Sequence, residues 1–139
     1  MVDMAMTKYL LDTNVCIALF KHDQNVIDKI LSIGNKSCHI SEITIAELLY
    51  GASKSGRKSH FDDVKILTEL FEIVPIYPAL RIYGETKAIL ERQGNRIDDF
   101  DLLIGASALY NSFTLVTHNV KHFARIKGLA FEDWENQRA

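Results

Sequence analysis

The feature that most constrains this chain is the stretch Lys8-Tyr9-Leu10-Leu11-Asp12-Thr13-Asn14. A short apolar run that ends abruptly in an acid and two small polar residues is typical of a buried parallel strand. In open α/β sheets the carboxyl ends of such strands border the binding crevice, so the pattern predicts that Asp12 lies in a crevice. The alternative is that Asp12 only caps the following helix, with Thr13 or Asn14 sharing that task.

Length and composition favour one compact domain over residues 1–139. The 139 residues are 47% hydrophobic, which suffices for a core, and no linker or repeat interrupts them. The formal charge of −2 argues against nonspecific coating of nucleic acid. A polyanionic partner must therefore meet a local basic patch or bind through metal ions.

The cysteines, the hydropathy and the first residues of the sequence bear on the cellular compartment of the protein. Cys16 and Cys38 lie in apolar sequence and favour a reducing cytoplasm. No apolar run approaches the roughly 18 residues of a membrane span. Residues 1–6 do not resemble a signal peptide, and Met6 is an alternative start to Met1. We expect a disordered extension over 1–6 and a frayed tail over 135–139.

Hydrophobic periodicity predicts an α/β fold. It favours a mostly parallel sheet of four to five strands with helices on both faces, in a three-layer sandwich. The expected strands cover residues 8–11, 37–40, 72–77, 113–117 and 129–131, and the expected helices cover 15–20, 25–33, 42–50, 61–71, 78–93 and 98–110. We expect Gly51 to end the third helix, and residues 54–60 to form a basic turn.

Several acids stand where the fold itself does not need them. Asp98, Asp99 and Asp101 crowd the start of one helix, although a helix start needs only one capping acid. Three carboxylates in four residues repel one another unless a cation intervenes. Glu47 lies on the apolar side of its helix. The plainer interpretation of Glu47 is a peripheral side chain with its stem packed and its carboxylate in water.

Together, these acids predict a metal site. If the sheet is parallel, Asp12, Glu47 and Asp101 can converge at one carboxyl-end crevice. Hard oxygen ligands select Mg²⁺ or Mn²⁺ rather than zinc. Such a site activates water and favours phosphodiester hydrolysis. Polar residues that follow two of the strands are candidate assisting groups: Thr13, Asn14, Thr117 and Asn119.

Two basic segments are candidate substrate contacts. Arg57 and Lys58 belong to the expected basic turn, and Lys121 belongs to a second cluster after the strand at 113–117. Both segments are also what an ordinary solvated surface looks like.

Four motifs in register give the chain a family resemblance. They are Leu11-Asp12-Thr13-Asn14; Ser41-Glu42-Ile43-Thr44 with Ala46-Glu47-Leu48-Leu49-Tyr50-Gly51; Phe100-Asp101-Leu102-Leu103-Ile104-Gly105-Ala106; and Val116-Thr117-His118-Asn119 leading to Phe123. In order and spacing the chain resembles the PIN-domain ribonucleases, and within them the VapC-type toxins of bacterial toxin–antitoxin pairs.

The resemblance implies a function. It implies a PIN-like fold in which Asp12, Glu47 and Asp101 are the essential acids, Asp12 and Asp101 hold Mg²⁺, and metal-activated water cuts RNA. It also implies a cognate VapB-type antitoxin that blocks the cleft, and commonly a homodimer. The subgroup that this chain looks most like cleaves initiator tRNA, so tRNA is the expected substrate.

The chain departs from the family pattern at two places. Many relatives carry a fourth acid where Asn119 stands, and a Gly-Pro pair where Asp98 and Asp99 stand. Asn119 weakens a second metal position. We expect Asp99 to assist in its place and Asp98 to cap the helix.

Other classes fit the residues less well. A phosphoacceptor receiver-like signalling domain needs an acid pair after its first strand, where this chain has only Asp12. A haloacid-type phosphatase needs a second acid at Asn14. A cleavage-dead RNA- or protein-binding module on the same fold would not need Asp12, Glu47 and Asp101 intact.

Overall fold

A single five-stranded sheet forms the centre of the molecule. The computed structural model describes residues 7–135, so the expectations for 1–6 and for 136–139 lie outside the described part. The strands follow the order β3-β2-β1-β4-β5, and each neighbouring pair is parallel. They are β1 (Tyr9–Leu11), β2 (Cys38–Ser41), β3 (Glu72–Val74), β4 (Thr114–Val116) and β5 (Phe131–Glu132). The expected α/β class is confirmed, with a sheet that is parallel throughout its described strands.

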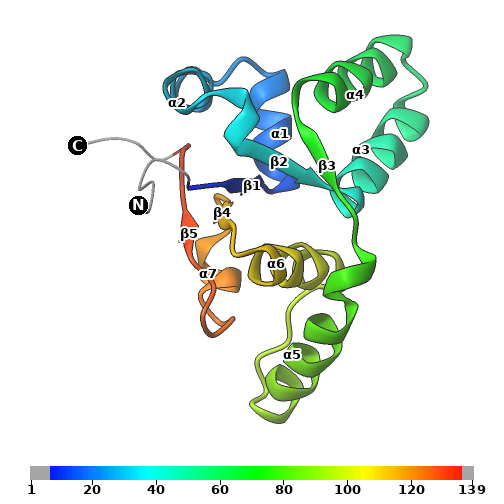
Figure 1. The fold of residues 1–139 in the computed structure, drawn as a ribbon. Helices are drawn as coiled ribbons and strands as arrows, with labels where there is room; N and C mark the ends of the chain where they lie inside the picture. The colour runs from blue at the N-terminus through cyan, green and yellow to red at the C-terminus, as the bar shows by residue number, and fades with distance from the viewer. Residues whose placement is uncertain (1–6, 136–139) are drawn as a thin grey trace.

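Helices cover both faces of the sheet. They are α1 (Thr13–Phe20), α2 (Gln24–Ile33), α3 (Glu42–Ser55), α4 (Lys58–Leu70), α5 (Leu80–Arg92), α6 (Asp99–Asn111) and α7 (Val120–Phe123), with the short 3-10 helices η1 (Asn35–Ser37) and η2 (Tyr77–Ala79). Figure 1 shows α1 to α4 on one side of the sheet and α5 to α7 on the other, which is the expected three-layer arrangement. None of the helices within residues 7–135 is long and apolar enough to cross a lipid bilayer.

The central strand β1 supplies both hydrophobic cores. Leu11 packs into the core under α1 to α4, which includes Val15 and Val64. Leu10 packs into the core under α5 to α7, which includes Leu102. Both leucines are completely buried. Successive strand residues point to opposite faces, so an apolar pair at this place is what permits helices on both sides.

The strand order leaves a crevice at the carboxyl edge of the sheet. Strand β1 has β2 on one side and β4 on the other, so the connections that follow them diverge, and such a switch point is where open α/β sheets bind ligands. The register aligns Leu11 with Ile40 and with Val116. The residues that come next, Asp12 and Thr117, therefore meet at this edge.

The helix boundaries around residue 51 differ from expectation. Helix α3 continues through Gly51 to Ser55 and ends at Gly56, whose φ is 68°. Ala52 continues the buried face of the helix, and a glycine inside a helix costs only about 1 kcal/mol, so packing carries the helix onward. Because α4 already begins at Lys58, the expected basic turn shrinks to two residues.

Small residues in α6 allow a close approach of the chain that follows β4. A Cβ atom added at Gly105 would lie 2.8 Å from Ile126 Cδ1 and 3.4 Å from Phe123 Cε1. Phe123 and Ile126 are both buried. Helix α6 is therefore tightly packed at Gly105.

This packing predicts opposite effects for two glycine substitutions. Gly105→Ala should lower the free energy of unfolding by about 1–3 kcal/mol, because Ile126 has to move within a filled core. The matched control is Gly84→Ala in α5, where an added Cβ meets nothing within 4 Å. That substitution should raise the free energy of unfolding by about 1 kcal/mol through helix propensity. Urea denaturation measures both, and equal stabilisation by the two alanines would contradict the close packing.

Candidate active site

Asp12 is a buried carboxylate at the centre of the crevice, with 2% of its surface exposed. Its Oδ1 accepts a hydrogen bond from the backbone nitrogen of Thr13 at 2.8 Å, and its Oδ2 accepts one from Thr117 Oγ1 at 2.9 Å. Burial raises the pKa of Asp12 to about 6 despite these bonds, and the charges of Asp101 and Glu47 add to the rise. Asp12 does cap α1, but capping accounts for only one of its two oxygens.

Glu47 reaches the same place from α3. Thr13 Oγ1 donates to Glu47 Oε1 at 2.6 Å, and Thr44 Oγ1 lies 3.0 Å from the same threonine oxygen. Since Thr13 has one hydroxyl proton and gives it to Glu47, Thr44 must donate to Thr13. Burial raises the pKa of Glu47, the bond from Thr13 lowers it, and the charge of Asp101 raises it. Glu47 is therefore held within the site and is not a peripheral side chain.

Asp101 comes from the first turn of α6 and is partly buried. Burial and the charge of Asp98 raise its pKa, and His122 opposes this rise. His122 Nδ1 lies 3.7 Å from Asp101 Oδ2. The structure thus brings Asp12, Glu47 and Asp101 together from the end of β1, from α3 and from α6, close enough for the charge of Asp101 to raise the pKa of both Asp12 and Glu47.

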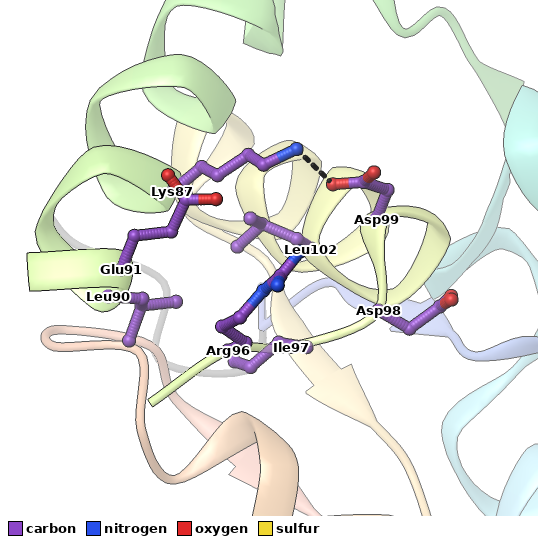
Figure 2. Close-up of a pocket in the computed structure, with 8 residues that line it drawn as sticks. All are labelled: Lys87, Leu90, Glu91, Arg96, Ile97, Asp98, Asp99 and Leu102. Carbon is purple, nitrogen blue, oxygen red and sulfur yellow. Dashed lines mark ion pairs between the residues drawn. The ribbon is translucent and has the colours of Figure 1, made fainter. Parts of the chain in front are cut away.

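The neighbouring aspartates point in different directions. Asp99 accepts from Lys87 Nζ at 2.9 Å and from the Tyr83 hydroxyl at 3.0 Å, and Lys87 is the main cause of its lowered pKa. Figure 2 shows this ion pair, with Asp98 directed to another side. Asp98 caps α6 through Phe100 N, as expected, and its charge raises the pKa of Glu47 and of Asp101. The expected help from Asp99 has no contact to support it, whereas Asp98 acts on the site electrostatically.

The two asparagines line one groove, to which none of the three acids contributes. Asn119 N donates to Thr117 Oγ1 at 2.9 Å, so its backbone is linked to Asp12 through Thr117. Asn14 is exposed and, together with Asn119, lines a groove of about 560 Å³. Of the four expected assisting residues, Thr13 and Thr117 contact the acids directly, and the asparagines line the neighbouring groove without contacting the acids in any hydrogen bond of the described residues.

The basic candidates are not equally placed. Lys121 lies on α7, next to His122. Arg57 and Lys58 follow the far end of α3, which extends about 12 Å beyond Glu47 along the helix axis. Lys58 also pairs with Asp62 at 3.3 Å. Lys121 is therefore the nearer candidate for substrate contact along the chain path.

Two site residues are not singled out by sequence pattern. Thr44 sits inside a helix as an ordinary β-branched residue, and His122 stands in a basic segment. Both belong to the site only through contacts with residues distant in sequence. Thr44 contacts Thr13, which lies 31 residues earlier, and His122 on α7 contacts Asp101 on α6.

The donor chemistry of the site suits a hard divalent cation. Within residues 7–135 no group of three or more His, Cys, Asp or Glu side chains is already arranged as a metal-binding set. The carboxylates of Asp12, Glu47 and Asp101 nevertheless have raised pKa values, partly because of neighbouring carboxylate charges. A bound cation would offset this repulsion, and oxygen donors favour Mg²⁺ or Mn²⁺. The residues therefore fit such an ion.

Comparison with known proteins places this geometry in a family. The model of the PIN domain matches residues 9–129. The chain is 38% identical over 131 residues to "Ribonuclease VapC2" of Rickettsia felis, covering 91% of this chain and 98% of that protein. It is 30% identical over 131 residues to the "tRNA(fMet)-specific endonuclease VapC" of Shigella flexneri, covering 93% and 99%.

Solved structures of VapBC proteins are similar to this chain in fold as well as in sequence. The crystal structure of VapBC2 from Rickettsia felis bound to a promoter DNA fragment superposes with a TM-score of 0.85 at 36% identity, covering 92% of this chain and 99% of that one. The structure of VapBC-1 from nontypeable Haemophilus influenzae gives a TM-score of 0.79 at 34% identity, covering 92% and 98%.

The buried carboxylate predicts that Asp12→Asn stabilises the metal-free protein. Because the pKa of Asp12 is raised from 3.8 to about 6, the folded state holds a proton that the unfolded chain releases, and stability falls as pH rises across that interval. Asparagine removes this penalty. Chemical denaturation in EDTA should show a gain of about 2–3 kcal/mol near pH 7.5 and none near pH 4.

The matched control for this measurement is Asp99→Asn. Asp99 is exposed, and its pKa is lowered by Lys87, so the same substitution should not stabilise the protein at neutral pH and should lower its free energy of unfolding slightly. A loss of stability in Asp12→Asn at pH 7.5 would show that the Asp12 carboxylate stabilises the fold.

Proposed function

Because the chain belongs to the PIN-domain family and, within it, to the VapC ribonuclease toxins, we propose that it hydrolyses RNA phosphodiester bonds with Asp12, Glu47 and Asp101 as its essential acids. PIN-domain nucleases depend on a metal ion, and Mg²⁺ is the proposed one here, with Mn²⁺ able to substitute. The observation that supports this most is the meeting of the three acids at the switch point of the sheet.

Each acid has a defined part in the proposed reaction. Asp12 and Asp101 would hold the ion, which when bound supplies Lewis acidity and neutralises charge on phosphate oxygens. Thr117 and the backbone of Thr13 orient the Asp12 carboxylate. Thr13 fixes Glu47 through Oε1, which leaves Oε2 to take a proton from the attacking water. The raised pKa of Glu47 suits this role of general base.

The proposed substrate is a structured RNA, with tRNA first and initiator tRNA as its leading example. The relatives from Shigella flexneri and Salmonella typhimurium named as tRNA(fMet)-specific endonucleases are 30% and 32% identical to this chain. The net charge of −2 means that RNA must be attracted locally. The proposed contacts are Asn14 and Asn119, which line one groove, and Lys121, which precedes His122 on α7; Arg57 and Lys58 are secondary candidates.

The proposed partner is a VapB-type antitoxin, because the structural relatives are VapBC complexes. A homodimer and a cytoplasmic location complete the proposal. The match to a PIN domain over residues 9–129 does not support the receiver-like alternative. The retained acids argue against a cleavage-dead module.

Removing the carboxylate of a proposed ion ligand or of the proposed general base should greatly slow cleavage. Asp101→Asn and Glu47→Gln should each slow Mg²⁺-dependent cleavage of tRNA by about 10²–10⁴-fold, because one removes an ion ligand and the other a proton acceptor. Expression of the wild type should arrest bacterial growth, and both variants should relieve the arrest. The control is Glu85→Gln, an exposed acid paired with Arg81 on α5, which should cleave at the wild-type rate. Full activity of Asp101→Asn would remove Asp101 from the mechanism.

Substitutions of Asp98 and Asp99 should have different effects on the Mg²⁺ requirement in the same cleavage assay. Asparagine caps a helix as well as aspartate, so Asp98→Asn keeps the start of α6 and removes only a charge. Since Asp98 acts on Glu47 and Asp101, Asp98→Asn should raise the Mg²⁺ concentration needed for half-maximal cleavage about 3- to 10-fold. Asp99→Asn, whose charge is paired with Lys87, should change it little. The opposite order would restore Asp99 as the assisting acid.

A further inference from the structure

The groove of about 560 Å³ has no part in the proposed hydrolysis, because none of the three essential acids lines it. Small-molecule sites in proteins usually measure about 300–1,000 Å³, so the groove has room for part of a substrate. It is lined by helix α1, by the connection that follows β4 and by two further acids. The residues are Asn14, Ile17, Ala18, Lys21, Asp23, His118, Asn119 and Glu135.

One face of α1 forms a stripe along the groove. Asn14, Ile17 and Ala18 are three and four residues apart, and Lys21 at the end of the helix continues the same stripe. The stripe is about 10 Å long. Polar residues stand at its two ends, and apolar residues stand between them. A flat ring fits such a stripe, because its face can pack on the apolar middle while its edge meets a polar end.

His118 lines the groove from the connection after β4. Its Nδ1 lies 3.0 Å from Asp133 Oδ2, which orients the imidazole, and 60% of the side chain is exposed. Imidazole rings are among the groups on which unpaired RNA bases stack. The groove therefore offers both an aliphatic and an aromatic surface to a flat ring.

The charges of the groove favour a neutral occupant. Lys21 takes part in no ion pair within the described part of the chain, and Asp23 and Glu135 contribute two negative charges. A positive charge on His118 is offset by its partner Asp133. This lining repels a phosphate group, whereas a neutral ring with hydrogen-bond donors and acceptors meets no such repulsion.

Glu135 has hydrogen-bonding capacity that its neighbours do not use. Its Oε2 is buried and has no hydrogen-bond partner among the described residues. Burial raises the pKa of Glu135, His118 opposes the rise, and the charges of Asp133 and Asp23 add to it. The terminal torsion of a glutamate is soft, so either carboxylate oxygen can turn toward the groove. An N–H donor in the groove would satisfy this carboxylate, and Lys21 can donate to an acceptor of the same molecule.

Hydrogen bonds connect the groove to the acids. Asn119 N donates to Thr117 Oγ1 at 2.9 Å, and Thr117 Oγ1 donates to Asp12 Oδ2 at 2.9 Å. On the other strand, Asn14 lines the groove two residues after Asp12. A ring in the groove therefore belongs to a nucleotide near the phosphodiester that the acids would hydrolyse.

We propose that this groove binds one unpaired nucleobase next to the bond that is cut, with Lys21 and Glu135 holding its polar edge; the inference rests on the proposed function. Nucleobases carry N–H donors beside acceptors on their Watson–Crick edge, so a carboxylate and an ammonium group can hold that edge together. The edge is free only in an unpaired base, and the loops of a structured RNA supply such bases.

Removal of single bases tests the groove directly. The probe is a synthetic stem-loop that carries the site at which the full-length protein cuts tRNA, mapped from fragment ends. Stem-loops in which one nucleotide beside the cut lacks its base are compared with the intact RNA. At one of these positions, loss of the base should lower kcat/KM of the wild type by about 10- to 100-fold, because its stacking and edge contacts are lost.

Two substitutions link this effect to the groove. Lys21→Gln and Glu135→Gln should each lower kcat/KM for the intact RNA by about 5- to 30-fold and leave it almost unchanged for the RNA that lacks the base, because the contact is already absent there. The matched control is Lys65→Gln, an exposed lysine on α4, which should leave kcat/KM for both RNAs unchanged. Thermal unfolding verifies that each variant is folded.

Glu135→Gln also distinguishes a base from a phosphate in the groove. The amide removes a negative charge, so a bound phosphate would be held more tightly. A higher kcat/KM of Glu135→Gln for both RNAs would therefore overturn the proposal.

The outcomes separate this inference from the proposed function. Cleavage at equal kcat/KM with and without each base would overturn the base-binding groove and leave the nuclease proposal standing. Equal losses in Lys21→Gln for the intact and the base-free RNA would also overturn it. A wild-type protein that cuts no RNA would refute the proposed function, and this inference with it.

Discussion

The bond between Thr117 and Asp12 is the interaction around which the site is built. It joins the ends of β1 and β4, the two strands at the switch point, and it holds a carboxylate where almost no water reaches it. A buried carboxylate is costly unless it is hydrogen-bonded, and two bonds only partly offset the cost, as the raised pKa of Asp12 indicates. The fold therefore holds an energetically unfavourable carboxylate at the switch point of the sheet.

The two hydrophobic cores offset the cost of burying the Asp12 carboxylate. Leu10 and Leu11 anchor β1 on opposite faces, so the residue after them cannot move without disturbing either core. Glu47 is tied to the same strand end through Thr13. The repulsion among these carboxylates destabilises the fold, and in the proposed reaction the same repulsion would favour a bound divalent cation.

At the start of α6, neighbouring residues of the same type have different roles. Asp98 caps the helix and adds negative charge near the acids, Asp99 is taken up by Lys87, and Asp101 enters the site. The difference follows from the turn of the helix, which sends successive side chains in different directions. Opposite Asp101, the connection after β4 supplies His122, whose Nδ1 lies 3.7 Å from the Asp101 carboxylate.

The sequence by itself determined the α/β class and the mostly parallel sheet, and it singled out the three acids that the structure brings together. Apolar runs, their lengths and the charges that interrupt them are local properties, so they can be recognised without the fold. The tertiary structure alone decided how far α3 runs past Gly51, since burial of Ala52 outweighs the helix propensity of glycine. It also decided that Asp99 turns to Lys87, that Thr44 supports Thr13, and that His122 meets Asp101. Those contacts join elements distant in the chain, and their partners carry no local signal of one another.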